Sequence, residues 1–143
     1  MHPSLQIHEI TDLRQMLAQF PLIQYLNPKM TPARYQELLE QMLPHRYHMV
    51  GVFAADACVG LSGFWLGTKL YSGPYLEVDN FVVHEAYRSK GVGKLLLDWL
   101  TAHAQNQGCE TMMLDAYVVN HAAHKFYLRE GFVIKGFHFL KSL

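Results

Sequence analysis

Two periodicities divide the chain into segments. Alternation of apolar and polar residues, which is typical of half-buried strands, covers residues 5–10, 49–54, 58–66, 76–83, 111–118 and 132–140. Apolar residues at helical spacing predict helices over residues 13–20, 33–43, 91–107 and 122–130. No internal repeat or long linker interrupts this order, so we expect a single mixed α/β domain over residues 1–143.

Residues with strong end-of-helix preferences mark several boundaries. Pro21 predicts the end of the first helix, and residues 22–30 then read as a loop. The pair Thr31-Pro32 predicts the start of the second helix, with a capping hydroxyl followed by proline in the first turn. Asn120 predicts the cap of the last helix, which Gly131 ends.

The charges cancel and are spread along the chain. There are 12 Lys and Arg residues against 12 Asp and Glu residues, and half of the chain is apolar. A chain without a basic cluster lacks the electrostatic means to hold nucleic acid or an anionic membrane, so we expect neither as a partner. A small molecule bound in a cleft is the expectation that remains.

The cysteines and histidines do not form a recognisable metal or disulfide pattern. Cys58 and Cys109 lie far apart without a CxxC context, which is typical of free thiols in a reducing compartment. His121 and His124 are three apart but have no third ligand at convincing spacing, so no metal is expected. No stretch approaches the ~20 apolar residues that span a bilayer, and no leader pattern is visible. We expect a cytoplasmic protein.

The segment after the strand at residues 76–83 has the composition of an anion site. Consecutive N–H groups at a helix start point outward unpaired, and the helix dipole adds positive charge there. Gly91 and Gly93 let the backbone approach an anion closely, while Arg88, Lys90 and Lys94 add charge. A pyrophosphate fits this turn. The mononucleotide loop fails here because lysine follows a GxG and precedes Leu, and the dinucleotide fingerprint lacks its third glycine.

Two motifs resemble the GNAT superfamily of acetyl-CoA-dependent N-acetyltransferases. The turn Arg88-x-x-Gly91-x-Gly93 resembles its acyl-CoA pyrophosphate signature at every defined position. Downstream, the run from Asn120 through Phe126-Tyr127 to Gly131-Phe132 is similar to a second segment of the same family. The run from Ala123 to Lys141 looks most like small-amine members, among them aminoalkylphosphonate acetyltransferases.

The resemblance implies a fold and a donor site. The fold is a mixed, mostly antiparallel sheet of six to seven strands flanked by four helices. Acetyl-CoA lies between two splayed parallel central strands, here ending near Val83 and Tyr117, and a bulge in the first of them opens the gap. The cofactor-binding residues implied are Phe81, Val82, Val83, Arg88, Ser89, Lys90, Gly91, Val92, Gly93, Lys94, Asn120 and Tyr127.

Three residues are candidates for proton transfer. Glu77 and Asp79 share a strand face by the period of two, and a base is needed because an alkyl amine with a pKa of ~10 is mostly protonated at neutral pH. The resemblance implies a base at Glu77 in one branch of the family and at Asp79 in another, and both stay open. It also places Tyr127 near the sulfur, as the donor of a proton to the leaving thiolate.

The resemblance implies acetyl transfer to a primary amine by direct attack in a ternary complex. The aromatic residues Tyr25, Trp65, Tyr71 and Tyr75 are candidates for the walls of an amine pocket. A phosphonate would need a basic group, for which the candidates are Lys69, Arg46 and Lys29. The alternatives are a non-catalytic acyl-CoA-binding module and a protein or peptide N-acetyltransferase. A homodimer is a further expectation, since dimers are common in the superfamily.

Overall fold

Five strands form one sheet, in the order β1-β2-β3-β4-β5. They are β1 (Leu5–Ile10), β2 (Tyr47–Ala54), β3 (Ala57–Lys69), β4 (Gly73–Val83) and β5 (Thr111–Leu114). The computed structural model describes residues 4–143, so residues 1–3 of the expected domain lie outside it. Neighbouring strands are antiparallel except β4 and β5, which are parallel and pair over only four residues each.

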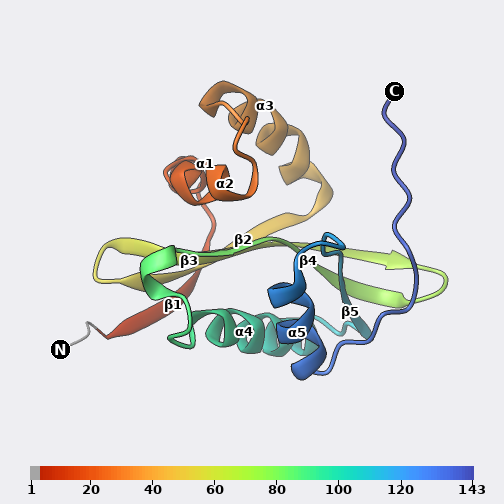
Figure 1. Cartoon of the computed structure of the whole chain (residues 1–143). Helices are drawn as coiled ribbons and strands as arrows, with labels where there is room; N and C mark the ends of the chain where they lie inside the picture. Colours follow the sequence, from red (N-terminus) through yellow and green to blue (C-terminus); the bar gives the residue numbers. More distant parts are fainter. Residues whose placement is uncertain (1–3) are drawn as a thin grey trace.

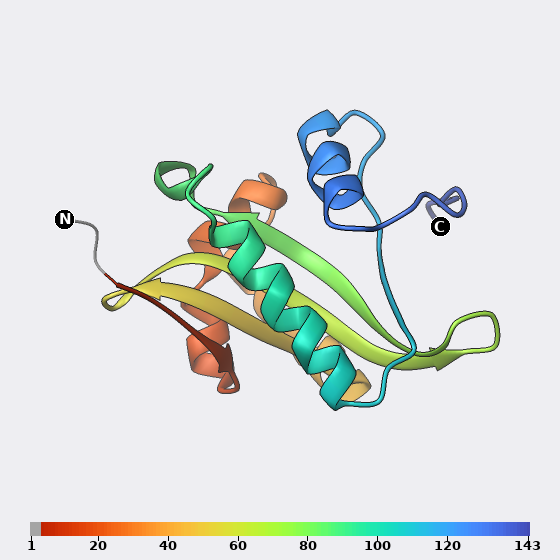
Figure 2. The same cartoon turned by 90° about the horizontal axis from the view of Figure 1, so that it is seen from below.

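Helices cover both faces of the sheet, as Figures 1 and 2 show. One face carries α1 (Leu13–Leu17), α2 (Phe20–Leu26) and α3 (Pro32–Met42), and the other carries α4 (Val92–Asn106) and α5 (His121–Arg129). Short 3₁₀ turns η1 (Leu43–His45) and η2 (Glu85–Tyr87) precede β2 and α4. Within residues 4–143, no helix has the length and apolar character needed to cross a membrane.

Each face of the sheet has its own hydrophobic core. Under α4, Phe64, Leu76 and Leu96 are completely buried together. Under α1–α3, Tyr47 and Leu61 pack with the buried residues of these helices. Because side chains alternate across a strand, the residues of β4 that do not enter one core face the other side of the sheet.

A β-bulge in β4 reverses this alternation. Leu61 pairs with Val82 and Gly63 with Asp79, so β4 has one residue more than β3 between these pairs. Asn80 takes up the extra residue in a left-handed conformation with φ of 52°. Before the bulge, even-numbered residues of β4 face α4; after it, Val82 faces α1–α3 instead. The bulge expected from the resemblance is therefore present.

The N-terminal helices differ from the expectation. The first helix ends at Leu17, and a second helix begins at Phe20. This second helix includes residues 22–26, for which a loop was expected. Pro21 does not end a helix but lies in the first turn of α2, where its missing N–H costs no hydrogen bond. Leu22 and Ile23 are buried in the core, which explains why the segment is helical. Residues 4–143 therefore form five α-helices rather than the expected four.

The C-terminal part also departs from the prediction, although the fold class is confirmed. The strand expected over residues 111–118 ends at Leu114, and residues 132–140 form no strand, so the sheet formed by residues 4–143 has five strands rather than six or seven. A strand needs hydrogen bonds to a neighbour, and within residues 4–143 the segment after Phe132 makes no backbone hydrogen bond. The remaining predicted strands and the helices at α3, α4 and α5 are found close to their expected limits.

Candidate active site

The start of α4 presents a row of free N–H groups. Ser89 and Gly91 are both left-handed, with φ of 60° and 85°, and this geometry turns successive amides to one side. Within residues 4–143, the six N–H groups from Ser89 to Lys94 have no hydrogen-bond acceptor. A Cβ at Gly91 would meet no atom within 4 Å, so the space in front of the turn is open. These amides and the helix dipole define an anion cradle.

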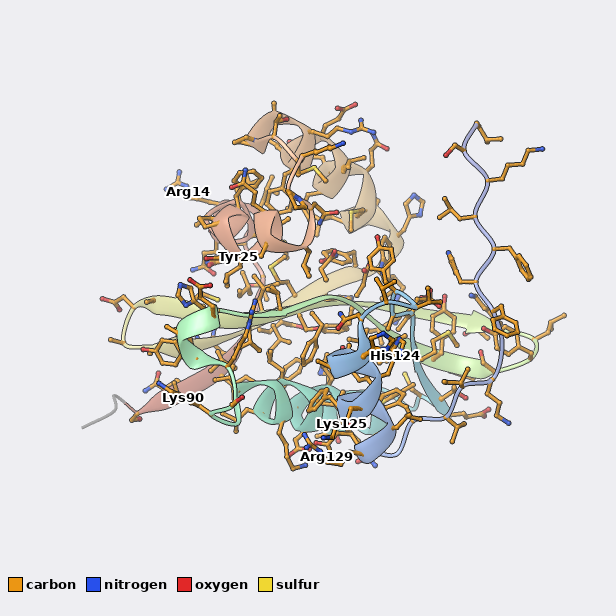
Figure 3. All side chains as sticks on the ribbon, viewed as in Figure 1. Arg14, Tyr25, Lys90, His124, Lys125 and Arg129 are labelled. Carbon is orange, nitrogen blue, oxygen red and sulfur yellow. The ribbon has the colours of Figure 1, made fainter. Side chains whose placement is uncertain are left out.

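The basic side chains around this anion cradle have different roles. Arg88 Nε donates to the Val83 carbonyl at 3.3 Å, which ties the turn to the end of β4. The Lys90 side chain lies beside the turn, 5.5 Å above the Tyr87 ring (Figure 3). Lys94 instead pairs with Asp98 at 3.1 Å and with Glu130 at 3.4 Å, so it joins α4 to α5.

Beyond Val78, β4 and β5 no longer pair, because β5 ends at Leu114. The His84 N–H donates to the Val59 carbonyl at 2.8 Å and so points to β3. Backbone groups alternate along a strand, so those of Val82 also point to β3, whereas those of Phe81 and Val83 face the side that β5 has left. The side chains of Val82 and Val92 are buried in the two cores, and the main-chain groups of Val82 pair with β3, whereas the N–H of Val92 is free for a ligand within residues 4–143.

Tyr127 lies beside this opening, on α5. Its ring makes edge contacts with Phe81 at 6.0 Å and Phe132 at 5.7 Å, and Phe126 lies next to it. Burial raises the pKa of the Tyr127 phenol to about 12, so the group is protonated at neutral pH. Gly93 brings α4 close to the same cluster, since a Cβ there would lie 3.7 Å from the Phe81 ring. The anion cradle, Phe81 and Tyr127 therefore belong to one site.

Asn120 begins α5, as the sequence predicted. Its Oδ1 accepts a hydrogen bond from the Ala123 N–H at 3.2 Å. His121 and His124 place their rings 5.9 Å apart, and His124 Nε2 lies 2.8 Å from the Tyr117 carbonyl oxygen. Within residues 4–143, no three His, Cys, Asp or Glu residues are grouped to hold a metal ion.

Glu77 and Asp79 share the face of β4 that is turned toward α1–α3, but their surroundings differ. Both oxygens of Asp79 are held: Oδ2 accepts from Trp65 Nε1 at 2.9 Å and Oδ1 from the Asn80 N–H at 2.8 Å. Glu77 lies between Trp65 on β3 and Met113 on β5 and has no hydrogen-bond partner within residues 4–143. Partial burial, together with the nearby charge of Asp115, raises the pKa of the Glu77 carboxyl.

The candidate aromatic and basic residues do not all meet. Lys69 lies above the rings of Tyr71 and Tyr75, at 5.8 and 5.3 Å, where the turn joins β3 to β4, the strand that carries Glu77. Tyr25 lies apart from them, with its ring 6.3 Å from that of His84. Arg46 lines a cavity of about 420 Å³ between η1, β2 and the end of α4, far from the anion cradle. Only Lys69, of the three basic candidates, is shown near the carboxylates.

Sequence reasoning missed several residues of this site. Asn80 forms the bulge, and its side chain donates to the Tyr47 hydroxyl at 3.0 Å. The available signal was an asparagine in a strand, since asparagine tolerates the left-handed conformation. Asp115 and His138, whose side chains are 3.3 Å apart, lie near Glu77 only through the tertiary fold, so no local pattern indicates them.

Comparison with known proteins identifies the family. The model of the acetyltransferase (GNAT) family matches residues 10–132, and the chain belongs to this family. It is 24% identical over 141 residues to YhdJ of Bacillus subtilis, an uncharacterized N-acetyltransferase, covering 97% of this chain and 99% of YhdJ. It is 36% identical to the aminoalkylphosphonate N-acetyltransferase of Salmonella typhimurium over 86 residues, which are 59% of this chain and 56% of that protein. The chain is thus an acetyl-CoA-dependent N-acetyltransferase.

Solved structures confirm the fold. The aminoglycoside N-acetyltransferase AAC(6')-Iy in complex with CoA aligns over 100% of this chain and 97% of its own, with a TM-score of 0.86 and 17% identity. Glucosamine-6-phosphate N-acetyltransferase of Arabidopsis thaliana aligns over 97% of this chain and 98% of its own, with a TM-score of 0.74 and 18% identity. At these identities, the likeness establishes the shared fold of the chains.

Proposed function

We propose that this enzyme transfers the acetyl group of acetyl-CoA to a primary amine of a small cationic molecule, by direct attack in a ternary complex. One observation carries the proposal. On the bulged strand β4, the carboxylate of Glu77, which has no hydrogen-bond partner within residues 4–143, faces one side of the sheet, while Phe81 and the anion cradle lie on the other. β4 and β5 no longer pair beyond Val78, and this opening connects the two faces of the sheet. The acetyl donor and the amine acceptor would meet there from opposite faces.

The donor half accounts for the parts of CoA. The free N–H groups of residues 89–94 would hold the pyrophosphate, with Arg88 and Lys90 beside it. The backbone groups of Phe81 and Val83 would hydrogen-bond the amides of the pantetheine arm, since they face the unpaired side of β4. Asn120 is assigned to the wall of this site, in addition to its role as helix cap.

We assign the base to Glu77 rather than Asp79. Only about one alkyl amine in a thousand is unprotonated at pH 7, so a group must take the ammonium proton before attack. Glu77 is half-buried, has free oxygens within residues 4–143, and has a raised pKa, all of which suit a proton acceptor. Asp79 is held by Trp65 and the Asn80 N–H, which suits a fixed carboxylate that orients the amine.

Tyr127 supplies the proton that the sulfur needs. As the carbon–nitrogen bond forms and the carbon–sulfur bond breaks, the phenol gives its proton to the thiolate. The second proton lost by the nitrogen then restores the phenol through water. With a pKa of about 12, the phenol stays protonated at neutral pH and is therefore present as an acid when the leaving thiolate takes up a proton. The raised pKa of both thiols, Cys58 to about 11, argues against a covalent acyl-enzyme.

The charges around Glu77 favour a cationic acceptor. Asp79 and Asp115 add two carboxylates near it, whereas Lys69 and His138 are the basic groups close to it. After Glu77 has accepted the proton of the substrate's ammonium group, the carboxylates of Asp79 and Asp115 would still attract a second positive charge on the substrate. An aminoalkylphosphonate is the second candidate, supported by Lys69 and by the similarity to the Salmonella enzyme.

The free thiols of Cys58 and Cys109 support a reducing, cytoplasmic location.

A thiol-release assay with a panel of amines tests the proposal. The panel contains a polyamine, an aminoglycoside, aminoethylphosphonate and a lysine peptide. We expect turnover with the polycations, weak turnover with the phosphonate, and none with the peptide. In Tyr127→Phe, kcat falls about 10- to 100-fold while the KM values of both substrates stay unchanged, because only the acid is lost. Preference for the phosphonate or the peptide would overturn the acceptor assignment, and CoA binding without turnover on the whole panel would overturn the proposed reaction.

A further inference from the structure

The bulge of β4 is held by a side chain from β2, on the far side of β3. Tyr47 begins β2 and is buried in the core under α1–α3. Its hydroxyl accepts a hydrogen bond from Asn80 Nδ2 at 3.0 Å. A buried hydroxyl needs such a partner, and Asn80 is the extra residue of the bulge, whose position the pairing with β3 does not fix. The bond from Asn80 to Tyr47 therefore anchors a residue that the sheet leaves free.

A glycine on β3 makes this reach possible. β3 lies between β2 and β4, and Gly63 is its residue opposite Asp79. A Cβ at Gly63 would collide with the ring and the hydroxyl of Tyr47. The Tyr47 ring therefore crosses β3 at a position without a side chain, and a larger residue at position 63 would push the hydroxyl away from Asn80.

Four residues form a closed set of contacts at the bulge, here called the bulge network: Tyr47, Trp65, Asp79 and Asn80. The Asn80 N–H donates to Asp79 Oδ1 at 2.8 Å, and Trp65 Nε1 donates to Asp79 Oδ2 at 2.9 Å. The Trp65 indole in turn packs edge-on against the Tyr47 ring, with the ring centroids 5.0 Å apart. Each member contacts two others, so a change at Tyr47 reaches the Asp79 carboxylate by two routes.

We propose that Tyr47 is a positioning residue of the active site, whose hydroxyl holds Asn80 and so keeps the bulge and the Asp79 carboxylate in a single arrangement. Residues before and after the bulge serve opposite faces of the sheet, and a strand that slips by one residue turns its side chains over. A bulge without its anchor would therefore misplace Glu77 and Asp79 relative to the opening between β4 and β5. The consequence for the amine rests on the proposed function, in which Asp79 orients the acceptor.

The indole signals of the two tryptophans test the bulge network without turnover. The chain contains only Trp65 and Trp99, so the nitrogen-labelled protein gives two indole N–H cross-peaks in an NMR spectrum, and Trp65→Phe assigns them. Tyr47→Phe removes only the hydroxyl, and Asn80→Gly keeps the left-handed backbone but removes the side chain. We expect the Trp65 cross-peak to shift in both variants, and that of Trp99, which packs on the other face of the sheet, to stay in place. A Trp65 cross-peak that does not move in either variant would overturn the proposal.

Steady-state kinetics with spermidine, as the polyamine of the panel, tests the positioning role. We expect kcat/KM for the amine to fall about tenfold in Tyr47→Phe and in Asn80→Gly, while the Kd of CoA changes by less than about twofold because the amides of the anion cradle are intact. The double variant should be no worse than either single variant, because both substitutions break the same bond. Losses that multiply in the double variant, or an unchanged kcat/KM in Tyr47→Phe, would overturn the positioning role.

Tyr35→Phe is the matched control. Tyr35 is a buried tyrosine of the same core, and its hydroxyl donates to the Met16 carbonyl at 2.8 Å, so this substitution also removes one buried hydrogen bond. We expect a drop in Tm similar to that of Tyr47→Phe, with the Trp65 cross-peak and kcat/KM unchanged. An equal loss of activity in Tyr35→Phe would mean that Tyr47 acts through stability alone, and would overturn the positioning role. A wild-type chain that turns over no amine would overturn the proposed function, whereas the hold of Tyr47 on Asp79 would still be decided by the indole cross-peaks.

Discussion

The anion cradle at the start of α4 and the proposed acceptor face of β4 are built in opposite ways. The cradle is a single local segment, and its chemistry belongs to the main chain: free N–H groups of residues 89–94 and the left-handed Gly91. The acceptor face is assembled from several strands, and its chemistry belongs to side chains: Glu77, Asp79 and Trp65. Only the parting of β4 and β5 connects them.

This contrast predicts opposite sensitivities. A main-chain site tolerates the loss of side chains but not the addition of one, because a Cβ can both strain the turn and block the anion. A side-chain site loses its function when one functional group changes, even if the shape is kept.

Glu77→Gln should have the largest effect. The amide keeps the shape but cannot accept the ammonium proton, so we expect kcat/KM to fall about 10²- to 10³-fold with an unchanged KM for acetyl-CoA. Asp79→Asn is the matched control, and its effect should be smaller because Asp79 is held by two hydrogen bonds. Steady-state kinetics measures both; a larger loss in Asp79→Asn would move the base to that residue.

The pH dependence sharpens the same comparison. Since the pKa of Glu77 is raised, activity should fall as the pH drops through a value above the ordinary pKa of glutamate, and this limb should vanish in Glu77→Gln. A raised pKa means that the folded state disfavours the charged carboxylate, so stability is lost as the pH rises through it. Glu77→Gln should therefore not lower Tm at neutral pH, and a drop in Tm there would contradict the direction of the shift.

Gly91→Ala should come next. Its Cβ would enter the open space in front of the turn at φ of 85°, so we expect the KM for acetyl-CoA to rise about tenfold, with some loss of stability from the left-handed backbone, ~1–2 kcal/mol. Gly108→Ala at the other end of α4 is the control, because Gly108 is also left-handed, with φ of 75°, and equally unobstructed. It should lose similar stability and keep its KM. Equal KM changes in the two variants would mean that strain alone is at work.

Lys94→Ala should have the smallest effect. The sequence assigned this lysine to the pyrophosphate, but its ammonium group is shared with Asp98 and Glu130. We expect the KM for acetyl-CoA to change by about twofold or less, since exposed ion pairs contribute little. Lys90→Ala is the comparison, and it should raise this KM more. If Lys94→Ala raised it more than Lys90→Ala, the ammonium group of Lys94 would belong to the donor site after all.

Local signals predicted what is locally built. The period of two predicted β1, β2, β3 and β4, and the helical spacing predicted α3, α4 and α5, all close to their observed limits. The helix caps were also predicted correctly: the Thr31 hydroxyl accepts a hydrogen bond from the Arg34 N–H at 3.1 Å, and Asn120 caps α5 in the same way. The helix end predicted at Pro21 was wrong, because proline either ends a helix or occupies its first turn. Only the burial of Leu22 and Ile23 decides between these two positions.

By itself, the sequence determined the family and the anion cradle, since one continuous turn and one downstream segment carry both. It also offered Glu77 and Asp79 as candidates for the base, because the family resemblance points to one or the other and a period of two puts them on one face. Only the tertiary structure separated them, by giving Asp79 hydrogen bonds from Trp65 and Asn80 and leaving Glu77 free within the described chain. The structure likewise decided that residues 132–140 form no strand within one copy. A strand is specified by its partner as much as by its own pattern, and the pattern alone does not say where the partner is.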